Sequence, residues 1–359
     1  DPDYRAYLMD GMRPAAWVLE RPGRWIAEPT GATAHLPVET LHLTNAGLAH
    51  QTAPLDATVA SPAHCGASAG EYCAIWLGPE MPGDQRQDDA LSTTFDTGPL
   101  VKNMDIVGAP RITLRVSCDK PQGQIAVRLN HIHPDGASAR ITYGVLNLSH
   151  RNSAENPAAM VPGKTEEISF DLDHIAYRVP AGHSLRVSIS TAYWPLIWPT
   201  PETAALTLSG GTIALPQRPT AGGDEYAFPP PTAAEPWQTE TLRPENHIRR
   251  QETDMVSGNV SLVIVDDFGK VKDAGHGLIN GSVARERWTI NPDDPLSATG
   301  LCHWTEELER DGIKLRTETH SKMWSDATTF YLTARLEAYE NGTLIYERDV
   351  EDGIPRHFM

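Results

Sequence analysis

The stretch GQIAVRLNHIHPDGASARITYGVLNLSH, residues 123–150, decides the fold class. Its two ends, residues 123–133 and 139–150, mix apolar and polar positions in the manner of half-buried β-strands. Pro134-Asp135-Gly136 stands between them, and these three residue types favour a turn because proline presets φ and glycine accepts a positive φ. The stretch therefore predicts two antiparallel strands joined by a tight turn.

The same pattern continues on both sides of this stretch. RITLRVSC, residues 111–118, alternates polar and apolar positions with period two. Pro180-Ala181-Gly182 predicts another turn, directly before a strand. The other strands that we expect are residues 165–172, 183–191 and 205–215. Seven or so short antiparallel strands fit a jelly-roll β-sandwich, which we assign to residues 91–215.

Two regions beside the sandwich have a different composition. Residues 1–90 are broken repeatedly by proline, and only residues 40–44 predict a strand there. Such a segment cannot form a core of its own, so we expect it to wrap over another surface. Residues 216–257 read as a Pro-rich linker, and FPPPTAAEP, residues 228–236, predicts an extended, polyproline-like chain.

Residues 258–359 predict a second β unit. Residues 259–267 form an expected strand, and two hairpins follow with Asp311-Gly312 and Asn341-Gly342 at their turns. These dipeptides supply the two positive-φ residues of a type I′ turn, whose twist matches paired strands. We therefore expect an antiparallel β-meander with one face buried against the sandwich or against another domain.

Composition excludes several classes of function. The 359 residues carry a net charge of −17, which repels nucleic acids and anionic membranes. No run of eighteen apolar residues and no secretory signal occurs, so we expect no membrane partner and a cytoplasmic location. The chain opens at Asp1 without a methionine, so we expect a further segment upstream.

The four cysteines, Cys65, Cys73, Cys118 and Cys302, form no CxxC pair, so they predict no zinc site. Cys65 and Cys73 are close enough in sequence to bridge a loop, whereas a cytosolic protein would keep them reduced. The sequence leaves both alternatives open.

The string Gly66-Ala67-Ser68-Ala69-Gly70 matches the GxSxG pattern of α/β-hydrolases, in which a tight turn between a strand and a helix presents the nucleophilic serine. The context here does not fit. No apolar strand precedes the string, and prolines break the segment that follows it. We therefore interpret Ser68 as part of a loop rather than as a nucleophile.

The pair His131-x-His133 alternates on an expected strand, so both imidazoles point to one side. With Asp135 they could hold a metal, but spacing indicates no third ligand, so we favour a plain strand end. We interpret His276, His303 and His320 as lying apart in the second β unit, because their spacing fits no ligand pattern. We predict no metal and no cofactor.

Two loops flank the sandwich and carry the candidate site residues. In MPGDQRQDDALSTTF, residues 81–95, Arg86 stands among Asp84, Asp88 and Asp89 and could form an ion-pair network. In AYWPLIWP, residues 192–199, aromatic side chains either contact a ligand or partner, or plug the end of the sandwich. The aromatic residues concerned are Tyr193, Trp194 and Trp198.

Five segments in order give the chain a family resemblance. The segments are RAYLMDGMRPA, ERPGRWIAEP, PGDQRQDDALSTTFDTGPL, ITLRVSCDKPQGQIAVRLNHIHPDG and YWPLIWPTPE, and the resemblance covers about residues 5–215. They resemble the CocE/NonD hydrolases, the cocaine-esterase and X-Pro dipeptidyl-peptidase group, from the exit of the α/β-hydrolase domain through the C-terminal sandwich. Residues 216–359 resemble a C-terminal extension of longer members.

This resemblance implies a galactose-binding-like sandwich and a parent serine hydrolase acting on esters or X-Pro peptides. The family's nucleophile, acid and histidine all precede the segment that opens this chain, so no catalytic residue is carried onto it. The implied partner is an N-terminal α/β-hydrolase domain, on which the sandwich packs so that the loops with Asp84, Arg86 and Asp88 and with Tyr193, Trp194 and Trp198 line one edge of the pocket. A chain without that domain should expose an apolar patch and could form a homo-oligomer.

Two other functions remain open from the sequence. A jelly-roll with exposed aromatic and acidic side chains could be a carbohydrate-binding module. The chain could also be an unusual complete enzyme that uses Ser68 or the pair His131 and His133.

Overall fold

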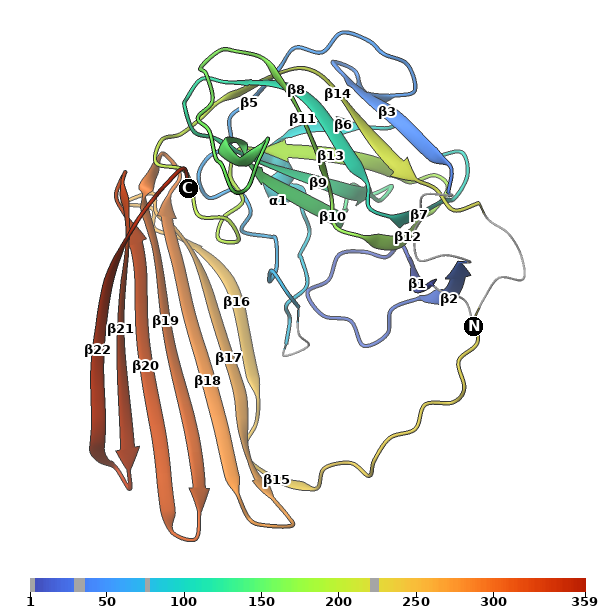
Figure 1. Cartoon of the computed structure of the whole chain (residues 1–359). Helices are drawn as coiled ribbons and strands as arrows, with labels where there is room; N and C mark the ends of the chain where they lie inside the picture. Colours follow the sequence, from blue (N-terminus) through green and yellow to red (C-terminus); the bar gives the residue numbers. More distant parts are fainter. Residues whose placement is uncertain (1–3, 29–35, 75–77, 220–225) are drawn as a thin grey trace.

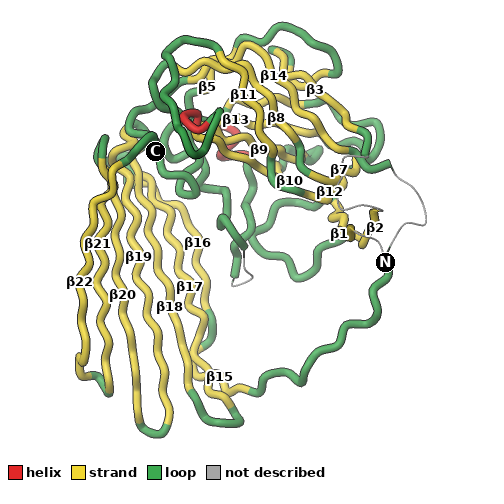
Figure 2. The backbone as a smooth tube through the Cα atoms, viewed as in Figure 1, coloured by secondary structure: helices red, strands yellow, loops and turns green. Residues whose placement is uncertain are grey.

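The computed structural model describes residues 4–28, 36–74, 78–219 and 226–359, and almost all of its regular structure is β (Figure 2). The described residues contain one short α-helix, α1 (Arg86–Ala90), and a 3-10 turn at Leu148–His150. Among them, no helix combines the length and apolarity that crossing a bilayer requires. The predicted all-β class is thus confirmed.

A β-sandwich occupies the middle of the chain. It consists of two sheets that enclose one apolar core. The first sheet has the order β10 (Ser138–Asn147), β9 (Gln124–Ile132), β13 (Ser184–Ser190), β6 (Thr93–Asp96). The second has the order β11 (Glu166–Asp171), β8 (Arg111–Cys118), β14 (Leu206–Pro216), β3 (Val38–Thr44), β4 (Gly47–Ala49), and β5 (Ala57–Val59) also pairs with β14. The strands predicted for the sandwich are all present.

The core follows from the period-two pattern of the strands. In β8, Ile112, Leu114 and Val116 are buried while Arg111 and Arg115 are exposed. Burying one such aliphatic side chain contributes about 1.5–3 kcal/mol, so the facing sheets are held by apolar contact. Strand β9 differs, because eight of its nine residues are buried and a second layer covers its other face.

A third, smaller sheet corrects the prediction that residues 1–90 are almost entirely irregular. Its order is β2 (Gly23–Glu28), β1 (Tyr4–Asp10), β12 (Ile175–Val179), β7 (Met104–Gly108), and β1 pairs with β12 in parallel. Leu8 and Ile26 are fully buried there against Val107. These strands complete a core with β7 and β12, which is why a proline-rich segment could form them. Residues 1–3, 29–35 and 75–77 of this region lie outside the described residues.

Residues 239–355 form the predicted antiparallel meander, with eight strands in one sheet. They are β15 (Thr239–Arg243), β16 (Asn246–Thr253), β17 (Val260–Asp273), β18 (Ile279–Asn291), β19 (Asp294–Arg310), β20 (Ile313–Ser325), β21 (Thr329–Glu340) and β22 (Thr343–Pro355). The meander begins at Thr239 rather than at residue 258, because the polar β15 and β16 both pair with β17. The linker is accordingly shorter, its residues 226–238 are in no strand, and its residues 220–225 lie outside the described residues.

Both predicted type I′ turns are confirmed. Asp311 and Gly312 have φ values of 53° and 80°, and Asn341 and Gly342 have 49° and 84°. Each turn joins strands in direct register, Arg310 opposite Ile313 and Glu340 opposite Thr343. In Figure 1 these two turns lie at the end of the meander that points away from the sandwich.

The first prediction concerns the turn at Gly342. No atom lies within 4 Å of an added Cβ there, so Gly342→Ala adds only the strain of a left-handed backbone, about 1–2 kcal/mol. We expect the midpoint of urea unfolding to fall accordingly. Gly98→Ala, at an equally open site without a positive φ, is the control and should change stability by less than about 0.5 kcal/mol. Equal effects of the two variants would contradict the turn assignment.

Candidate functional site

The outer face of β9 and β13 carries polar side chains beneath helix α1. Asn130 and Ser188 are both fully buried there, and their side chains donate to Asp89 Oδ1 at 2.9 and 2.7 Å. Ser138 Oγ donates to the other carboxylate oxygen at 2.7 Å, and Arg186 Nη1 does so at 3.2 Å. Asp89 is therefore a fully partnered buried carboxylate that fixes α1 against the sheet.

Arg128 is the charged centre of this layer, with no exposed side-chain surface. Its Nη2 donates to the main-chain oxygen of Asp88 at 3.1 Å and to Ser92 Oγ at 2.6 Å, and its Nη1 donates to Gln85 Oε1 at 3.2 Å. The guanidinium also lies 3.5 Å from Asp89 Oδ1 and 3.9 Å from Asp88 Oδ2. One buried cation thus faces two buried carboxylates.

The Gly66–Gly70 string binds the second of these carboxylates. The backbone N–H groups of Gly66 and Ser68 donate to Asp88 Oδ1 and Oδ2 at 3.1 and 3.0 Å. Burial raises the pKa of Asp88, and the charge of Arg128 together with these N–H groups opposes that rise. The glycine-rich string therefore acts as an anion-binding loop for a carboxylate of the same chain.

Ser68 does not have the surroundings of a nucleophile. Residues 61–70 contain only turns and bends, with no adjoining strand or helix to form a nucleophile elbow. Among the described contacts, no histidine nitrogen hydrogen-bonds to its hydroxyl. Burial raises the pKa of the neighbouring Cys65 thiol to about 11, which keeps it protonated at neutral pH. All four cysteines are free, so Cys65 and Cys73 form no bridge.

The aromatic loop lies directly on this string and is a plug rather than an exposed surface. Tyr193 and Trp194 are each only 1% exposed. The backbone N–H of Trp194 donates to the carbonyl of Cys65 at 2.7 Å, and Arg128 lies 5.9 Å from the Tyr193 ring centre. A Cβ on Gly66 would lie 2.7 Å from the Trp194 backbone, so only glycine fits there.

The two tryptophans of this loop connect the sandwich to the meander. Trp194 packs in a cluster with Ala63, Ile290 and Ala298. Trp198 Nε1 donates to Ser325 Oγ at 3.0 Å, and its ring lies edge-on to Phe330 at 6.3 Å. The aromatic side chains predicted as a site therefore form an interface within this chain.

The remaining two candidate residues lie at the surface. The side chains of Asp84 and Arg86 are 29% and 61% exposed and pair at 2.8 Å. Asp84 Oδ1 also accepts from the backbone N–H of Ser138 at 3.3 Å, which ties this pair to β10. The predicted network is thus split, because Asp88 and Asp89 turn inward to Arg128 and not to Arg86.

Two pockets adjoin these elements. A pocket of about 320 Å³ lies at the end of the sandwich between Tyr193, Ile197, Trp198, Phe330 and the C-terminal Met359. It is lined mainly by apolar side chains, and the described residues place no nucleophile–histidine–acid set on its wall.

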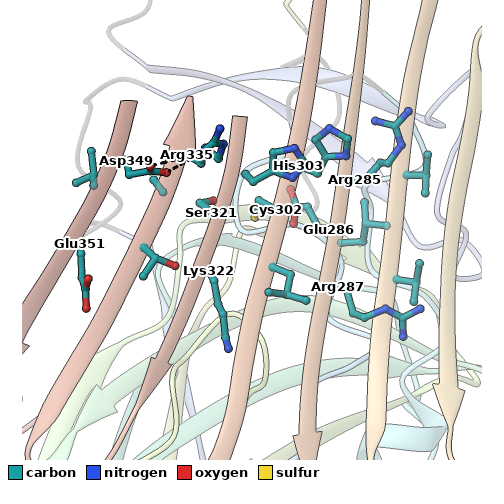
Figure 3. A pocket seen from close by; sticks show the side chains of 18 residues that line it. Arg285, Glu286, Arg287, Cys302, His303, Ser321, Lys322, Arg335, Asp349 and Glu351 are labelled. Carbon is teal, nitrogen blue, oxygen red and sulfur yellow. Dashed lines mark hydrogen bonds and ion pairs between the residues drawn. The ribbon is translucent and has the colours of Figure 1, made fainter. Parts of the chain in front are cut away.

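The larger pocket, about 930 Å³, lies on the meander (Figure 3). There His303 and His320 are register partners with stacked rings 4.1 Å apart, so the interpretation that they lie apart was wrong. His303 Nε2 contacts Glu318 Oε2 at 2.7 Å. Ser321 is adjacent to His320 on the strand, so its side chain points to the opposite face and cannot complete a triad.

His131 and His133 lie on one side of the chain, as predicted, with ring centres 4.1 Å apart. The structure adds a third imidazole, because His131 Nε2 lies 2.6 Å from His183 Nδ1. This partner could not be found from sequence spacing, because 52 residues separate the two positions. His183 joins the pair only through the pairing of β9 with β13.

Comparison with known proteins adds a family. The family of X-Pro dipeptidyl-peptidase C-terminal non-catalytic domains matches residues 1–248. The cocaine esterase of Rhodococcus sp. (strain MB1 Bresler) is 24% identical over 148 residues, 40% of this chain and 25% of the esterase. A relative from Mycobacterium bovis is 27% identical over 126 residues, 30% of this chain and 20% of its own. The chain thus matches a fifth to a quarter of the length of these relatives.

Two solved structures match this chain at lower sequence identity than these relatives do. An aminopeptidase from a marine sediment archaeon, Thaumarchaeota archaeon, has a TM-score of 0.47 and 15% identity, over 54% of this chain and 38% of its own. An α-amino acid ester hydrolase has a TM-score of 0.44 and 19% identity, over 50% of this chain and 36% of its own.

The second prediction tests the buried charge layer. Arg128→Met leaves Asp88 and Asp89 without their cation in a buried site, which should cost about 3–5 kcal/mol of stability at pH 7. Arg111→Met is the matched control, because Arg111 is 58% exposed and its pair with Asp171 should contribute less than about 1 kcal/mol. Urea unfolding followed by tryptophan fluorescence measures both. Similar losses of stability in the two variants would show that the buried charge layer around Arg128 contributes no more than a surface ion pair.

Proposed function

The chain belongs to the family of X-Pro dipeptidyl-peptidase C-terminal non-catalytic domains, and from this we propose that it is the accessory region of a serine hydrolase acting on acyl esters or X-Pro peptides. In this role it packs on an N-terminal α/β-hydrolase domain and lines part of the substrate pocket. The chain by itself is inactive. We also propose a jelly-roll connection of the sandwich strands and a cytoplasmic location, which four free cysteines favour.

One observation carries the proposal: an apolar sheet face on the meander that the described residues leave partly exposed. Trp288 and Ile290 of β18 contact the sandwich through Trp194 and mark this inner face. Trp288 is opposite Gly300, so the even-numbered positions of β19 share its side of the sheet. Trp304 and Leu308 lie on that side and are 40% and 46% exposed.

The inner face continues over the remaining strands. By register it includes Leu315 opposite Leu308, and further out Leu332, Tyr346 and Val350. Each of these side chains is between 36% and 50% exposed. Contiguous apolar patches of this kind mark interaction sites on soluble proteins, and they are costly to leave in water. A docked hydrolase domain would cover the face.

The described residues also favour a non-catalytic role. The Ser68 hydroxyl has no base, and the pKa of the half-buried Cys302 thiol is raised, first by burial and then by Glu286. The substrate-pocket edge is then formed by the exposed pair Asp84 and Arg86. The buried Asp88, Tyr193 and Trp194, with the half-buried Trp198, support that edge from behind.

A carbohydrate-binding module is disfavoured by the same observations. Sugar recognition by a jelly-roll needs aromatic faces at the surface. Tyr193 and Trp194 are 1% exposed and occupied by contacts within the chain.

The third prediction is that the 359-residue chain carries no serine nucleophile. Incubation with a fluorophosphonate probe should give no labelled protein, and a p-nitrophenyl ester should turn over at the rate of the buffer blank. A Ser68→Ala variant is the control for background. Stoichiometric labelling that this substitution removes would overturn the proposal and make the chain a hydrolase.

The fourth prediction concerns docking in the full-length enzyme. Leu308→Asp with Leu315→Asp places two charges in the buried interface, so kcat/KM should fall at least about tenfold and the catalytic domain should become susceptible to proteolysis. Leu301→Asp is the matched control, since Leu301 is 41% exposed on the other face. Unchanged kcat/KM and unchanged proteolysis in the double variant would contradict docking through the inner face.

A further inference from the structure

Three imidazoles meet at one end of the sandwich, outside the site described above. His131 is in β9, His133 follows that strand, and His183 directly precedes β13. The register of β9 with β13 sets His131 opposite Leu185, which brings the start of β13 beside the end of β9. One nitrogen of each ring lies within 4.8 Å of one nitrogen of the other two. Three separate positions of the chain thus bring one ring nitrogen each into the same small volume.

The outer nitrogens of two rings have partners that orient them. His133 Nε2 lies 3.1 Å from the carbonyl oxygen of Met12, which can only accept, so this nitrogen carries the hydrogen and Nδ1 keeps a lone pair. His131 Nδ1 lies 2.9 Å from the Tyr177 hydroxyl. With its hydrogen on Nδ1, His131 accepts at Nε2 from His183 Nδ1, so zinc binding requires the His183 hydrogen to move to its other nitrogen. Metal-binding histidines characteristically use their second nitrogen in this way.

Burial, together with the neighbouring His133 and His183, lowers the pKa of His131 to about 3. Burial and His133 also lower the pKa of His183, while Asp135 opposes that shift. Of the charged groups nearby, Arg21 disfavours a cation, whereas Asp135 favours one.

We propose that His131, His133 and His183 bind one Zn²⁺ ion, with a fourth position for water. Zinc takes imidazole nitrogens at about 2.0–2.1 Å in a tetrahedral arrangement, which sets neighbouring nitrogens about 3.3 Å apart. The 2.6 Å contact between His131 and His183 opens to accept the ion, and the His133 nitrogen, which lies within 4.8 Å of the other two, moves inward. Three neutral nitrogen ligands match zinc better than magnesium or calcium, which prefer oxygen.

The ion would fasten the N-terminal segment to the sandwich. Met12 supplies the carbonyl that orients His133, and Gly11 packs so closely that an added Cβ would lie 2.6 Å from Cε1 of His131. The ion would therefore connect β9, the turn before β13 and the loop at residues 11–12. Its role is structural, since this loop covers the site.

The experiment is zinc titration of the untagged 359-residue chain after treatment with a chelator. Calorimetry should show one Zn²⁺ per chain with a Kd in the micromolar range or tighter. At saturation Tm should rise by about 3 °C or more, because the ion binds only the folded state. Co²⁺ in place of Zn²⁺ should give the visible absorption of a four-coordinate site.

His133→Ala and His183→Ala should each weaken zinc binding at least about a hundredfold and remove the rise in Tm. His303→Ala is the control, because His303 belongs to the second cluster of possible ligands on the meander, with Glu318 and His320. There Glu318 is already paired with Arg316 at 2.7 Å. The control variant should bind zinc as the unchanged chain does.

Circular dichroism of the zinc-free variants shows whether they fold. His183 is only half-buried, so its substitution carries the test if His133→Ala does not fold. The proposal is overturned if the chelated chain binds no Zn²⁺. It is equally overturned if a folded His183→Ala variant binds as tightly as the unchanged chain, or if His303→Ala removes the binding.

Discussion

The buried guanidinium of Arg128 is the interaction on which the rest of the structure depends. A charge without solvent is costly unless other charges and hydrogen bonds compensate for it, and here Asp88 and Asp89 do so. Asp89 holds α1 on the sheet, and Asp88 holds the loop at Gly66 and Ser68. That loop supplies the carbonyl that positions Trp194, and Trp194 packs against Ile290 and Ala298 of the meander. The orientation of the second β unit thus follows from one polar layer.

This arrangement gives several chemistry-bearing residues of the described chain a structural task. The backbone of the GxSxG string binds the carboxylate of Asp88. The aromatic loop packs at the contact between the sandwich and the meander. What remains for a partner is the exposed pair of Asp84 and Arg86 and the apolar inner face of the meander. A chain with these surfaces is suited to hold and orient a separate catalytic domain.

The sequence predicted the fold well where local chemistry is decisive. Period-two strands such as residues 111–118 and the turns at Asp311-Gly312 and Asn341-Gly342 form as expected. The prediction from sequence failed where a strand forms only because it pairs with residues far away in the chain. Strands β1 and β2 exist because β7 and β12 complete their core, and β15 and β16 exist because the long strand β17 pairs with both of them along the edge that β18 does not occupy.

In the site, Arg128 and Asn130 alternate with the core positions of β9, which indicates that the polar face of this strand is covered. Their acidic partners, Asp88 and Asp89, lie 40 and 41 residues upstream, so local patterns could not identify them. His183 likewise joins His131 only through strand pairing.

Docking of a catalytic domain on the inner face is tested most directly by hydroxyl-radical footprinting of Trp304 and Tyr346 in the isolated chain and in the full-length enzyme. Both side chains are at least 40% exposed in this structure. We predict strong oxidation of these two side chains in the isolated chain and at least fivefold protection of them in the full-length enzyme. Equal oxidation in both would show that the inner face does not receive the catalytic domain.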